Sequence, residues 1–134
     1  IRDRNSILQG CIEDEFQRKV FENPDISLEE MNTLHGQIYQ KYMGYPLEYE
    51  WVDIHHHFET PFYYISYATS AVSSLELWLV GTKNREDALN AYRNMTQNTL
   101  NVDYLDALKD SGFSNPFTSK VIKNISSEIK REFL

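Results

Sequence analysis

Apolar residues recur at helical spacing along most of the chain, and short polar breaks separate the segments. In the first segment, residues 5–21, an apolar residue occupies every fourth position among charged neighbours: Leu8, Ile12, Phe16 and Val20. A period of this kind is typical of a helix with one buried stripe. The pattern therefore predicts a first helix over residues 5–21.

A second helix is predicted from Ser27 to Gly44. Ser27 and Glu30 have the spacing of a capping box, in which the hydroxyl and the carboxylate each accept a hydrogen bond from a backbone amide of the first turn. Gly44 suits the left-handed conformation that commonly ends a helix. The predicted buried stripe of this helix consists of Met31, Leu34, Ile38 and Tyr42.

The most distinctive stretch is residues 51–81, WVDIHHHFETPFYYISYATSAVSSLELWLVG. Its first four residues suggest a short helical turn. Thr60 can then cap a long helix with its hydroxyl, and Pro61 suits the first helical position, where no amide donor is needed. An apolar run follows, and Gly81 provides a natural left-handed stop. The pattern predicts a long helix over about residues 61–81, buried on most sides.

Three further helices complete the predicted fold. Asn84 can cap one of them, another covers residues 102–111 and ends at Gly112, and the last begins near Thr118. No segment alternates in the way a strand requires. We therefore predict an all-α fold in which five or six helices pack around the helix over residues 61–81, as a single domain or subdomain. The residues expected to face inward after Asn84 are Leu89, Tyr92 and Met95.

Composition narrows the classes of partner. A chain of 134 residues with 41% apolar residues can form one domain with a single core. Its net charge of −7 argues against nucleic acid or an anionic membrane as a partner. Cys11 is the only cysteine, which excludes an internal disulfide and is compatible with the cytoplasm. Glu76 and four serines make residues 62–80 a buried helix rather than a membrane span.

The run His55, His56 and His57 raises the question of a metal site. Adjacent histidines point in divergent directions, and the helical zinc pattern H-E-x-x-H is absent from the chain. His35 is about twenty residues upstream and has no partner at ligand spacing. We therefore expect no metal site in this chain, although zinc held by His55 and His57 with Glu50 or Asp53 remains an alternative.

The tyrosines after Pro61 suggest a second kind of chemistry. Tyr63 and Tyr67 are four residues apart, and Tyr64 and Tyr67 are three apart, so either pair can project from one helical face. Neutral phenols are hydrogen-bond donors and could stabilise an oxyanion. Spacing alone favours the other interpretation, in which they fill the core and bond backbone carbonyls. The acidic run of Glu13, Asp14 and Glu15 is interpreted as a solvated helix face, and Cys11 as a core residue.

The residues around this stretch resemble the C-terminal part of oligoendopeptidase F-type zinc peptidases, relatives of thimet oligopeptidase. In that family a tryptophan precedes isoleucine-x-histidine, then threonine-proline-phenylalanine-tyrosine, then tyrosine-alanine. The matching residues are Trp51, Ile54, His56, Thr60, Pro61, Phe62, Tyr63, Tyr67 and Ala68. Weaker similarities extend over nearly the whole chain, at Glu15-Phe16, Ile26-Ser27-Leu28, residues 41–44 and residues 105–112.

The resemblance implies a part of a metallopeptidase that hydrolyses internal bonds of short peptides. In the family, zinc is held by H-E-x-x-H and a later glutamate, and those ligands would lie upstream of Ile1. This chain alone would therefore be inactive. Carried over by position, His56, Tyr63 and Tyr67 are the catalytic residues, whereas His57 and Tyr64 bind substrate. Which of the two histidines is the functional one stays open.

The resemblance also implies the partners. They would be short peptide substrates and the upstream zinc-binding part of the same enzyme. Self-association through an exposed apolar face is a further possibility, because helices that line a channel expose apolar surface when separated from their other half. The alternative function is a non-catalytic helical module that binds peptides or proteins and derives from such a peptidase.

Overall fold

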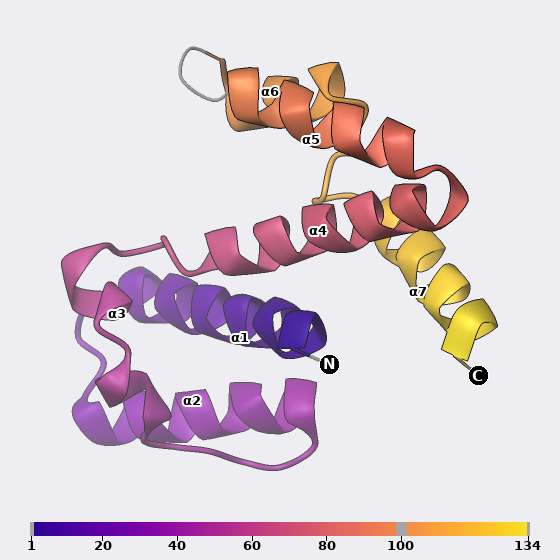
Figure 1. Cartoon of the computed structure of the whole chain (residues 1–134). Helices are drawn as coiled ribbons and strands as arrows, with labels where there is room; N and C mark the ends of the chain where they lie inside the picture. The colour runs from indigo at the N-terminus through magenta and orange to yellow at the C-terminus, as the bar shows by residue number, and fades with distance from the viewer. Residues whose placement is uncertain (1, 99–101, 134) are drawn as a thin grey trace. The chain divides into compact units, whose positions relative to one another are not determined.

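The computed structural model describes residues 2–98 and 102–133, and side chains within 6–97 and 102–132. These residues form seven α-helices and one short 3₁₀ helix, and contain no strand (Figure 1). The elements are α1 Arg2–Glu22, α2 Leu28–Met43, η1 Glu50–Asp53, α3 His56–Glu59, α4 Ile65–Lys83, α5 Arg85–Asn98, α6 Tyr104–Asp110 and α7 Ser119–Phe133. The all-α prediction is confirmed. The helix missing from the predicted count is the single turn α3.

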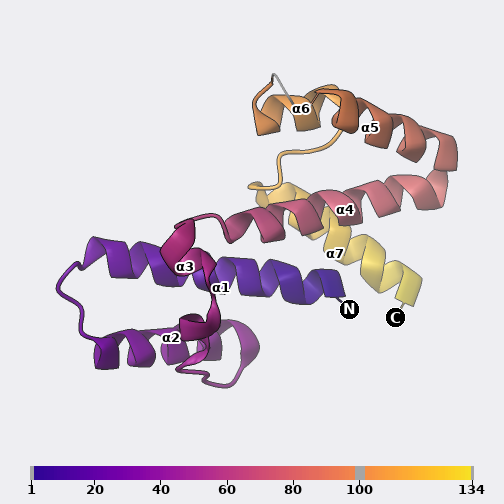
Figure 2. The same cartoon turned by 60° about the vertical axis from the view of Figure 1, so that its left-hand side comes forward.

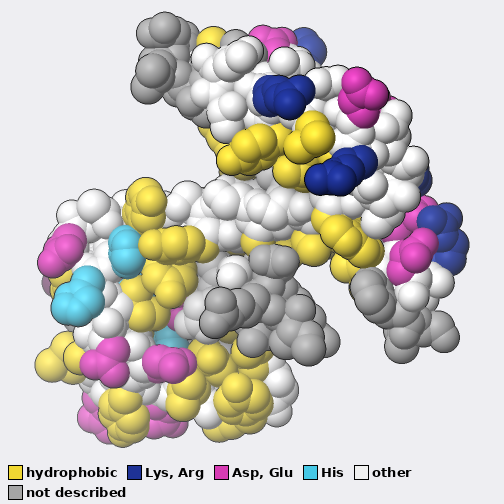
Figure 3. Space-filling view, in the orientation of Figure 1, with side chains coloured by type: hydrophobic (Ala, Val, Ile, Leu, Met, Phe, Trp, Pro, Cys, Tyr) yellow, Lys and Arg dark blue, Asp and Glu magenta, His cyan; other side chains and the backbone are white. Residues whose placement is uncertain are grey.

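The chain divides into two compact units, which meet between Ala68 and Thr69 within α4. The first unit has 12 acidic and 5 basic residues, whereas the second has 8 of each. On the face shown in Figure 3, acidic side chains are spread over the first unit, and the Lys and Arg side chains in view lie over the second. The whole net charge of −7 therefore belongs to the first unit.

Helices α1 and α2 lie side by side in the first unit (Figures 1 and 2). The predicted capping box begins α2: Glu30 N donates to Ser27 Oγ at 3.3 Å, and Ser27 N donates to Glu30 Oε2 at 2.8 Å. Gly44 ends the helix with a φ of 87°, in the left-handed region. Both ends of α2 are thus determined by local chemistry that the sequence displays.

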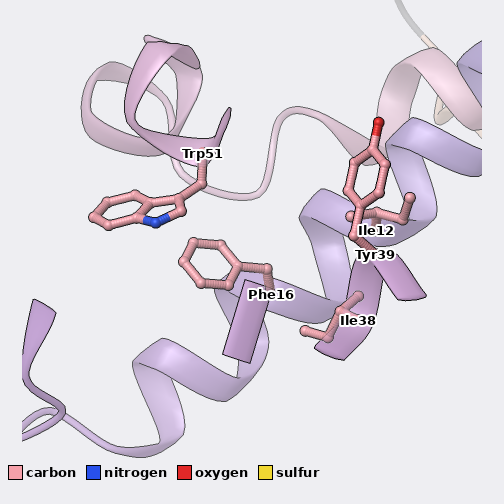
Figure 4. Packing of buried hydrophobic residues seen from close by; sticks show 5 residues of the cluster. All are labelled: Ile12, Phe16, Ile38, Tyr39 and Trp51. Atoms are coloured by element: carbon pink, nitrogen blue, oxygen red, sulfur yellow. The ribbon is translucent and has the colours of Figure 1, made fainter. Parts of the chain in front are cut away.

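The apolar core of the first unit joins α1, α2 and η1 (Figure 4). Phe16 packs against the indole of Trp51, with ring centroids 5.4 Å apart. Trp51 Nε1 donates to Asn32 Oδ1 at 3.0 Å, so the indole N–H stays paired at the edge of the core. The buried members are Ile12, Phe16, Ile38, Tyr39 and Trp51.

A carboxylate lies beside this core. Glu13 is fully buried, and its oxygens accept hydrogen bonds from Gln9 Nε2 at 2.5 Å and His57 Nε2 at 2.9 Å. His35 Nε2 lies 3.4 Å away. The prediction that Glu13 belongs to a solvated face is therefore wrong. The cause is that its histidine partners come from segments that sequence spacing does not relate.

The contacts of His35 determine where its protons lie. Its Nδ1 is 2.6 Å from the carbonyl oxygen of Leu47, which can only accept, so Nδ1 carries a hydrogen. Nε2 faces the Glu13 carboxylate, and a second proton must lie between the two groups. Burial opposes both charges, but the two imidazoles lower the pKa of Glu13, and Glu13, Leu47 and Glu50 raise the pKa of His35. Both shifts favour the imidazolium and the carboxylate, which is the state of the pair between the lowered pKa of Glu13 and the raised pKa of His35.

The long helix differs from its prediction at both ends. α4 begins at Ile65, not at Pro61, because Phe62 has a φ of 64° and interrupts the helical backbone. At the other end the helix continues through Gly81 to Lys83. The helix is also not buried on most sides, because Ser70, Ser74 and Trp78 form an exposed stripe at four-residue spacing.

In the second unit, α5 and α6 lie side by side (Figure 1). Asn84 Oδ1 accepts from Glu86 N at 2.9 Å, so the predicted cap is present. Leu89 and Tyr92 are exposed, and the prediction that they face inward is wrong. Glu76 accepts hydrogen bonds from the backbone and hydroxyl of Ser114, which attaches the segment after α6 to α4. The buried apolar residues of this unit include Ala71, Val72, Leu79, Ala107, Leu108, Val121 and Ile125.

Two helical glycines should respond to alanine with opposite signs. A Cβ at Gly10 would lie 2.7 Å from Ala68 Cβ and 3.0 Å from its backbone nitrogen, so Gly10→Ala should destabilise the chain by about 1–3 kcal/mol. A Cβ at Gly81 would meet only Ala88 Cβ, at 3.5 Å. Gly81→Ala should therefore stabilise by about 0.5–1 kcal/mol. Urea titrations followed by far-UV circular dichroism would measure both, and equal shifts would contradict the close approach.

The buried ion pair predicts a stability optimum in mildly acidic solution. The lowered pKa of Glu13 gives stability that is complete above about pH 4.3 and lost on acidification. The raised pKa of His35 gives stability that is complete below about pH 6.5 and lost as pH rises through the folded-state value. The free energy of unfolding should therefore peak between these limits.

The variant His35→Gln should lose the alkaline decline, because it removes the titrating imidazole. His55→Gln is the matched control, since His55 is exposed and should keep the decline. Unfolding free energies measured from about pH 5 to 8 would test whether His35 causes the alkaline decline. If the free energy falls with pH equally steeply in His35→Gln and in the unaltered chain, His35 is not the cause.

Candidate functional site

The predicted site residues lie on three consecutive pieces of the first unit. His56 and His57 are on the single turn α3, Tyr63 and Tyr64 lie in the connection to α4, and Tyr67 is in the first turn of α4. In Figure 3, histidine side chains lie at the surface of this unit beside hydrophobic side chains. The turn and the connection therefore form one surface of the molecule.

The ring of His56 is the centre of this cluster. It stacks on Tyr63, with centroids 5.3 Å apart and planes 8° from parallel. The rings of Tyr64 and Tyr67 meet it edge-on, at 5.6 and 5.7 Å. His56 Nε2 lies 3.4 Å from the hydroxyl oxygen of Tyr67. We call His56, Tyr63, Tyr64 and Tyr67 the aromatic cluster.

The tyrosines reach one another by a geometry that the spacing argument did not include. Tyr63 and Tyr64 precede α4, so no helical register aligns them with Tyr67. Their connection is instead tightened by i→i+3 bonds, from Tyr63 N to Thr60 O at 3.1 Å and from Tyr67 N to Tyr64 O at 3.1 Å. The Tyr64 and Tyr67 rings then lie 5.0 Å apart, and Tyr63 and Tyr67 lie 5.7 Å apart.

Exposure separates the cluster from the core. Tyr63 is 49% exposed and Tyr67 is 42% exposed, so neither fills the interior. Tyr64 is half-buried, and burial raises the pKa of its hydroxyl, with further contributions from Glu13 and Tyr67. Tyr64 therefore remains a neutral donor at working pH. The surface offers phenol hydroxyls and one imidazole to a ligand.

The neighbouring histidine points into the molecule instead. The side chain of His57 is 5% exposed, with Nε2 2.9 Å from Glu13 Oε2 and Nδ1 2.5 Å from Gln17 Nε2. Both of its ring nitrogens are therefore occupied by side chains of α1. Of the two histidines that the sequence leaves open, only His56 has its imidazole among the exposed tyrosines.

Sequence analysis missed two residues of this region, Glu13 and Gln17. Gln17 is 3% exposed, and its Oε1 accepts a hydrogen bond from Phe62 N at 2.6 Å. These contacts join residues 40 to 45 positions apart, which no local spacing rule detects. The sequence offers one indication that these two residues are buried: Glu13 follows Ile12 and Gln17 follows Phe16, next to the apolar stripe of α1.

No group of three or more histidine, cysteine, aspartate or glutamate side chains that could hold a metal ion occurs among the described residues. The alternative of zinc between His55, His57 and Glu50 or Asp53 therefore finds no support among these residues. Cys11 sits beside the core, where burial raises the pKa of its thiol, with Asp14 and Glu15 adding to the effect. That thiol is poorly suited to act as a nucleophile.

Within the part of the chain that the structure describes, every helix is too short or too polar to cross a membrane. No family model matches the chain, and no curated protein matches it by sequence. Solved structures do match it, and they all carry peptidase names.

Three solved structures share the fold of this chain. An oligoendopeptidase F structure matches 93% of the chain with a TM-score of 0.85 and 23% identity. Pz peptidase A, solved with an inhibitor, matches 93% with a TM-score of 0.86 and 22% identity. An oligoendopeptidase F from Bacillus anthracis str. Ames matches 94% with a TM-score of 0.76 and 28% identity.

The chain spans only 24%, 24% and 21% of the length of these structures, in the same order. Their similarity therefore concerns a part of each enzyme. The predicted resemblance is confirmed: this chain is similar in fold to about a quarter of an oligoendopeptidase F-type structure.

Proposed function

We propose that this chain is the C-terminal part of a cytoplasmic, zinc-dependent oligoendopeptidase that hydrolyses internal bonds of short peptides. Zinc and its H-E-x-x-H ligands would belong to the upstream part of the same enzyme, so this chain alone would be inactive. The observation that carries the proposal is the aromatic cluster, in which His56 meets three tyrosines at the surface of a peptidase-like fold.

The cluster has the chemistry that peptide hydrolysis needs beside the scissile bond. When the carbonyl carbon is attacked, its oxygen gains negative charge, and fixed donors stabilise it without reorganising. Tyr67 and Tyr63 would donate their phenol hydrogens to this oxygen, and His56 would donate from its imidazole. Tyr64 would contact the substrate at the inner edge of the cluster. A neutral phenol hydroxyl has one hydrogen to donate, which suits it to this role.

The proposal changes the role expected of His57. Because its two ring nitrogens are occupied by Glu13 and Gln17, we assign it to holding α3 in place, and His56 to the substrate. The excess of acidic residues in the first unit supports peptides as substrates, since it attracts a cationic amino terminus or basic side chains.

Apolar side chains remain exposed in both units, which supports an origin in a larger protein. Surfaces that contact another part of a protein carry more apolar side chains than surfaces that face only water. In the proposal, the upstream part of the enzyme covers part of this surface, and a second copy of the chain covers it when that part is missing. The exposed residues include Phe21, Leu28, Val52, Phe58, Leu89, Tyr92 and Phe117.

The test uses an enzyme in which this chain follows its H-E-x-x-H segment. Tyr67→Phe should lower kcat by about 10²–10³-fold with a much smaller change in KM, because the lost hydrogen bond belongs to the transition state. Tyr49→Phe is the matched control, since Tyr49 is 66% exposed and lies outside the cluster. Its kinetics should be unchanged.

Two results would count against the proposal. A raised KM with an unchanged kcat for Tyr67→Phe would mean that the hydroxyl only binds substrate. The absence of an H-E-x-x-H segment from the natural polypeptide, together with peptide binding but no hydrolysis, would indicate the alternative, a helical peptide-binding module.

A further inference from the structure

The segment that carries the aromatic cluster cannot maintain its own shape. α3 is a single turn of four residues, His56–Glu59, and isolated turns are unfavourable because nucleation costs more than one hydrogen bond returns. Phe62 follows with a φ of 64°, the one positive value at a non-glycine residue in the described chain. Such a conformation is strained for a residue with a Cβ atom. Something outside the segment must hold it.

One side chain of α1 contacts the segment at both of its weak points. Gln17 Oε1 accepts the hydrogen of Phe62 N at 2.6 Å, and Gln17 Nε2 lies 2.5 Å from His57 Nδ1. Gln17 itself is buried. The side-chain amide of Gln17 therefore forms hydrogen bonds on both sides of Thr60 and Pro61, with His57 before them and with Phe62 after them.

The direction of each hydrogen bond in this chain of contacts follows from the donors. A backbone N–H can only donate, so the amide oxygen of Gln17 must face Phe62 and its NH₂ must face His57. His57 Nδ1 then accepts, and the ring hydrogen must be on Nε2, which donates to Glu13 Oε2 at 2.9 Å. Only one placement of the hydrogens therefore gives a donor and an acceptor to every contact from Phe62 through Gln17 and His57 to Glu13.

This arrangement determines where the aromatic cluster lies. His56 directly precedes His57, and Tyr63 directly follows Phe62. The two rings that stack therefore each belong to a neighbour of a residue that is hydrogen-bonded to Gln17. Phe21 adds a ring contact to Phe62, with centroids 4.9 Å apart. The hydrogen bonds of Gln17 go to His57 and Phe62, so its influence on His56 and Tyr63 is indirect.

We propose that Gln17 is a positioning residue for the site formed by His56, Tyr63 and Tyr67. This inference rests on the proposed function, which it deepens by naming the residue that preorganises the donors. A donor set is effective only when held within a fraction of an ångström of its productive geometry, and a locked neighbouring side chain is the usual means.

The test follows the His56–Tyr63 stack by NMR in the full 134-residue chain, through ring-to-ring nuclear Overhauser cross-peaks. Gln17→Met keeps the length of the side chain and removes both hydrogen bonds. It should abolish the His56–Tyr63 cross-peaks, while the Phe16–Trp51 cross-peaks of the core remain. Gln37→Met, at an exposed position of α2, is the matched control and should change neither.

Gln17→Glu separates positioning from general packing. Its carboxylate can still accept from Phe62 N, as the amide oxygen does, but it has no hydrogen to donate to His57 Nδ1. The bond to Phe62 is therefore kept, and the bond from the amide NH₂ to His57 is lost. The His56–Tyr63 cross-peaks should be weaker than in the unaltered chain but stronger than in Gln17→Met.

Each outcome decides the proposal. If Gln17→Met keeps the His56–Tyr63 cross-peaks, or if Gln17→Glu loses them as completely as Gln17→Met does, Gln17 does not position the site. If Gln17→Met unfolds the first unit, seen as loss of the Phe16–Trp51 cross-peaks, Gln17→Glu gives the answer alone: weakened His56–Tyr63 cross-peaks with intact Phe16–Trp51 cross-peaks support positioning, and unchanged ones reject it. Expected NMR results with unaltered Tyr67→Phe kinetics would retain the positioning role and reject the peptidase site.

Discussion

The buried carboxylate of Glu13 is the constraint on which the first unit depends. An isolated charge in the interior costs several kcal/mol, so this one requires partners with defined geometry. They come from three segments: Gln9 from α1 itself, His35 from α2 and His57 from α3. Apolar contacts tolerate small shifts between helices, whereas hydrogen bonds to a buried ion do not. The carboxylate therefore specifies how α2 and α3 pack against α1.

The same constraint separates the roles of two adjacent histidines. Successive residues of a helix point about 100° apart, so a turn that aims His57 at Glu13 must direct His56 elsewhere. His56 consequently faces the tyrosines, and His57 is enclosed by Glu13 and Gln17. The surface donors and the buried anchor are thus two consequences of one orientation. The aromatic cluster, which begins on a short turn, is held in place because the neighbouring His57 is bound to α1.

Local chemistry explains which parts of the fold could be predicted. The capping box at Ser27, the left-handed Gly44 and the cap at Asn84 involve residues within a few positions of one another, and all three are present. The start of α4 was misplaced because Phe62 adopts a left-handed conformation stabilised by Gln17, 45 residues earlier in the chain. The burial of Glu13 was missed for the same reason, because its histidine partners are distant in sequence.

By itself, the sequence determined the all-α class, most helix ends, the aromatic character of residues 62–67 and the resemblance to oligoendopeptidase F-type enzymes. These features depend on periodicity, on caps and on residue types, which are properties of neighbouring positions. Only the tertiary structure decided that Glu13 is buried, that Gln17 accepts a hydrogen bond from Phe62 N, and that the ring nitrogens of His57 rather than those of His56 contact side chains of α1. Those outcomes depend on which polar groups meet when α1, α2 and α3 pack, and a buried polar group is placed by its partners rather than by its own position in the pattern.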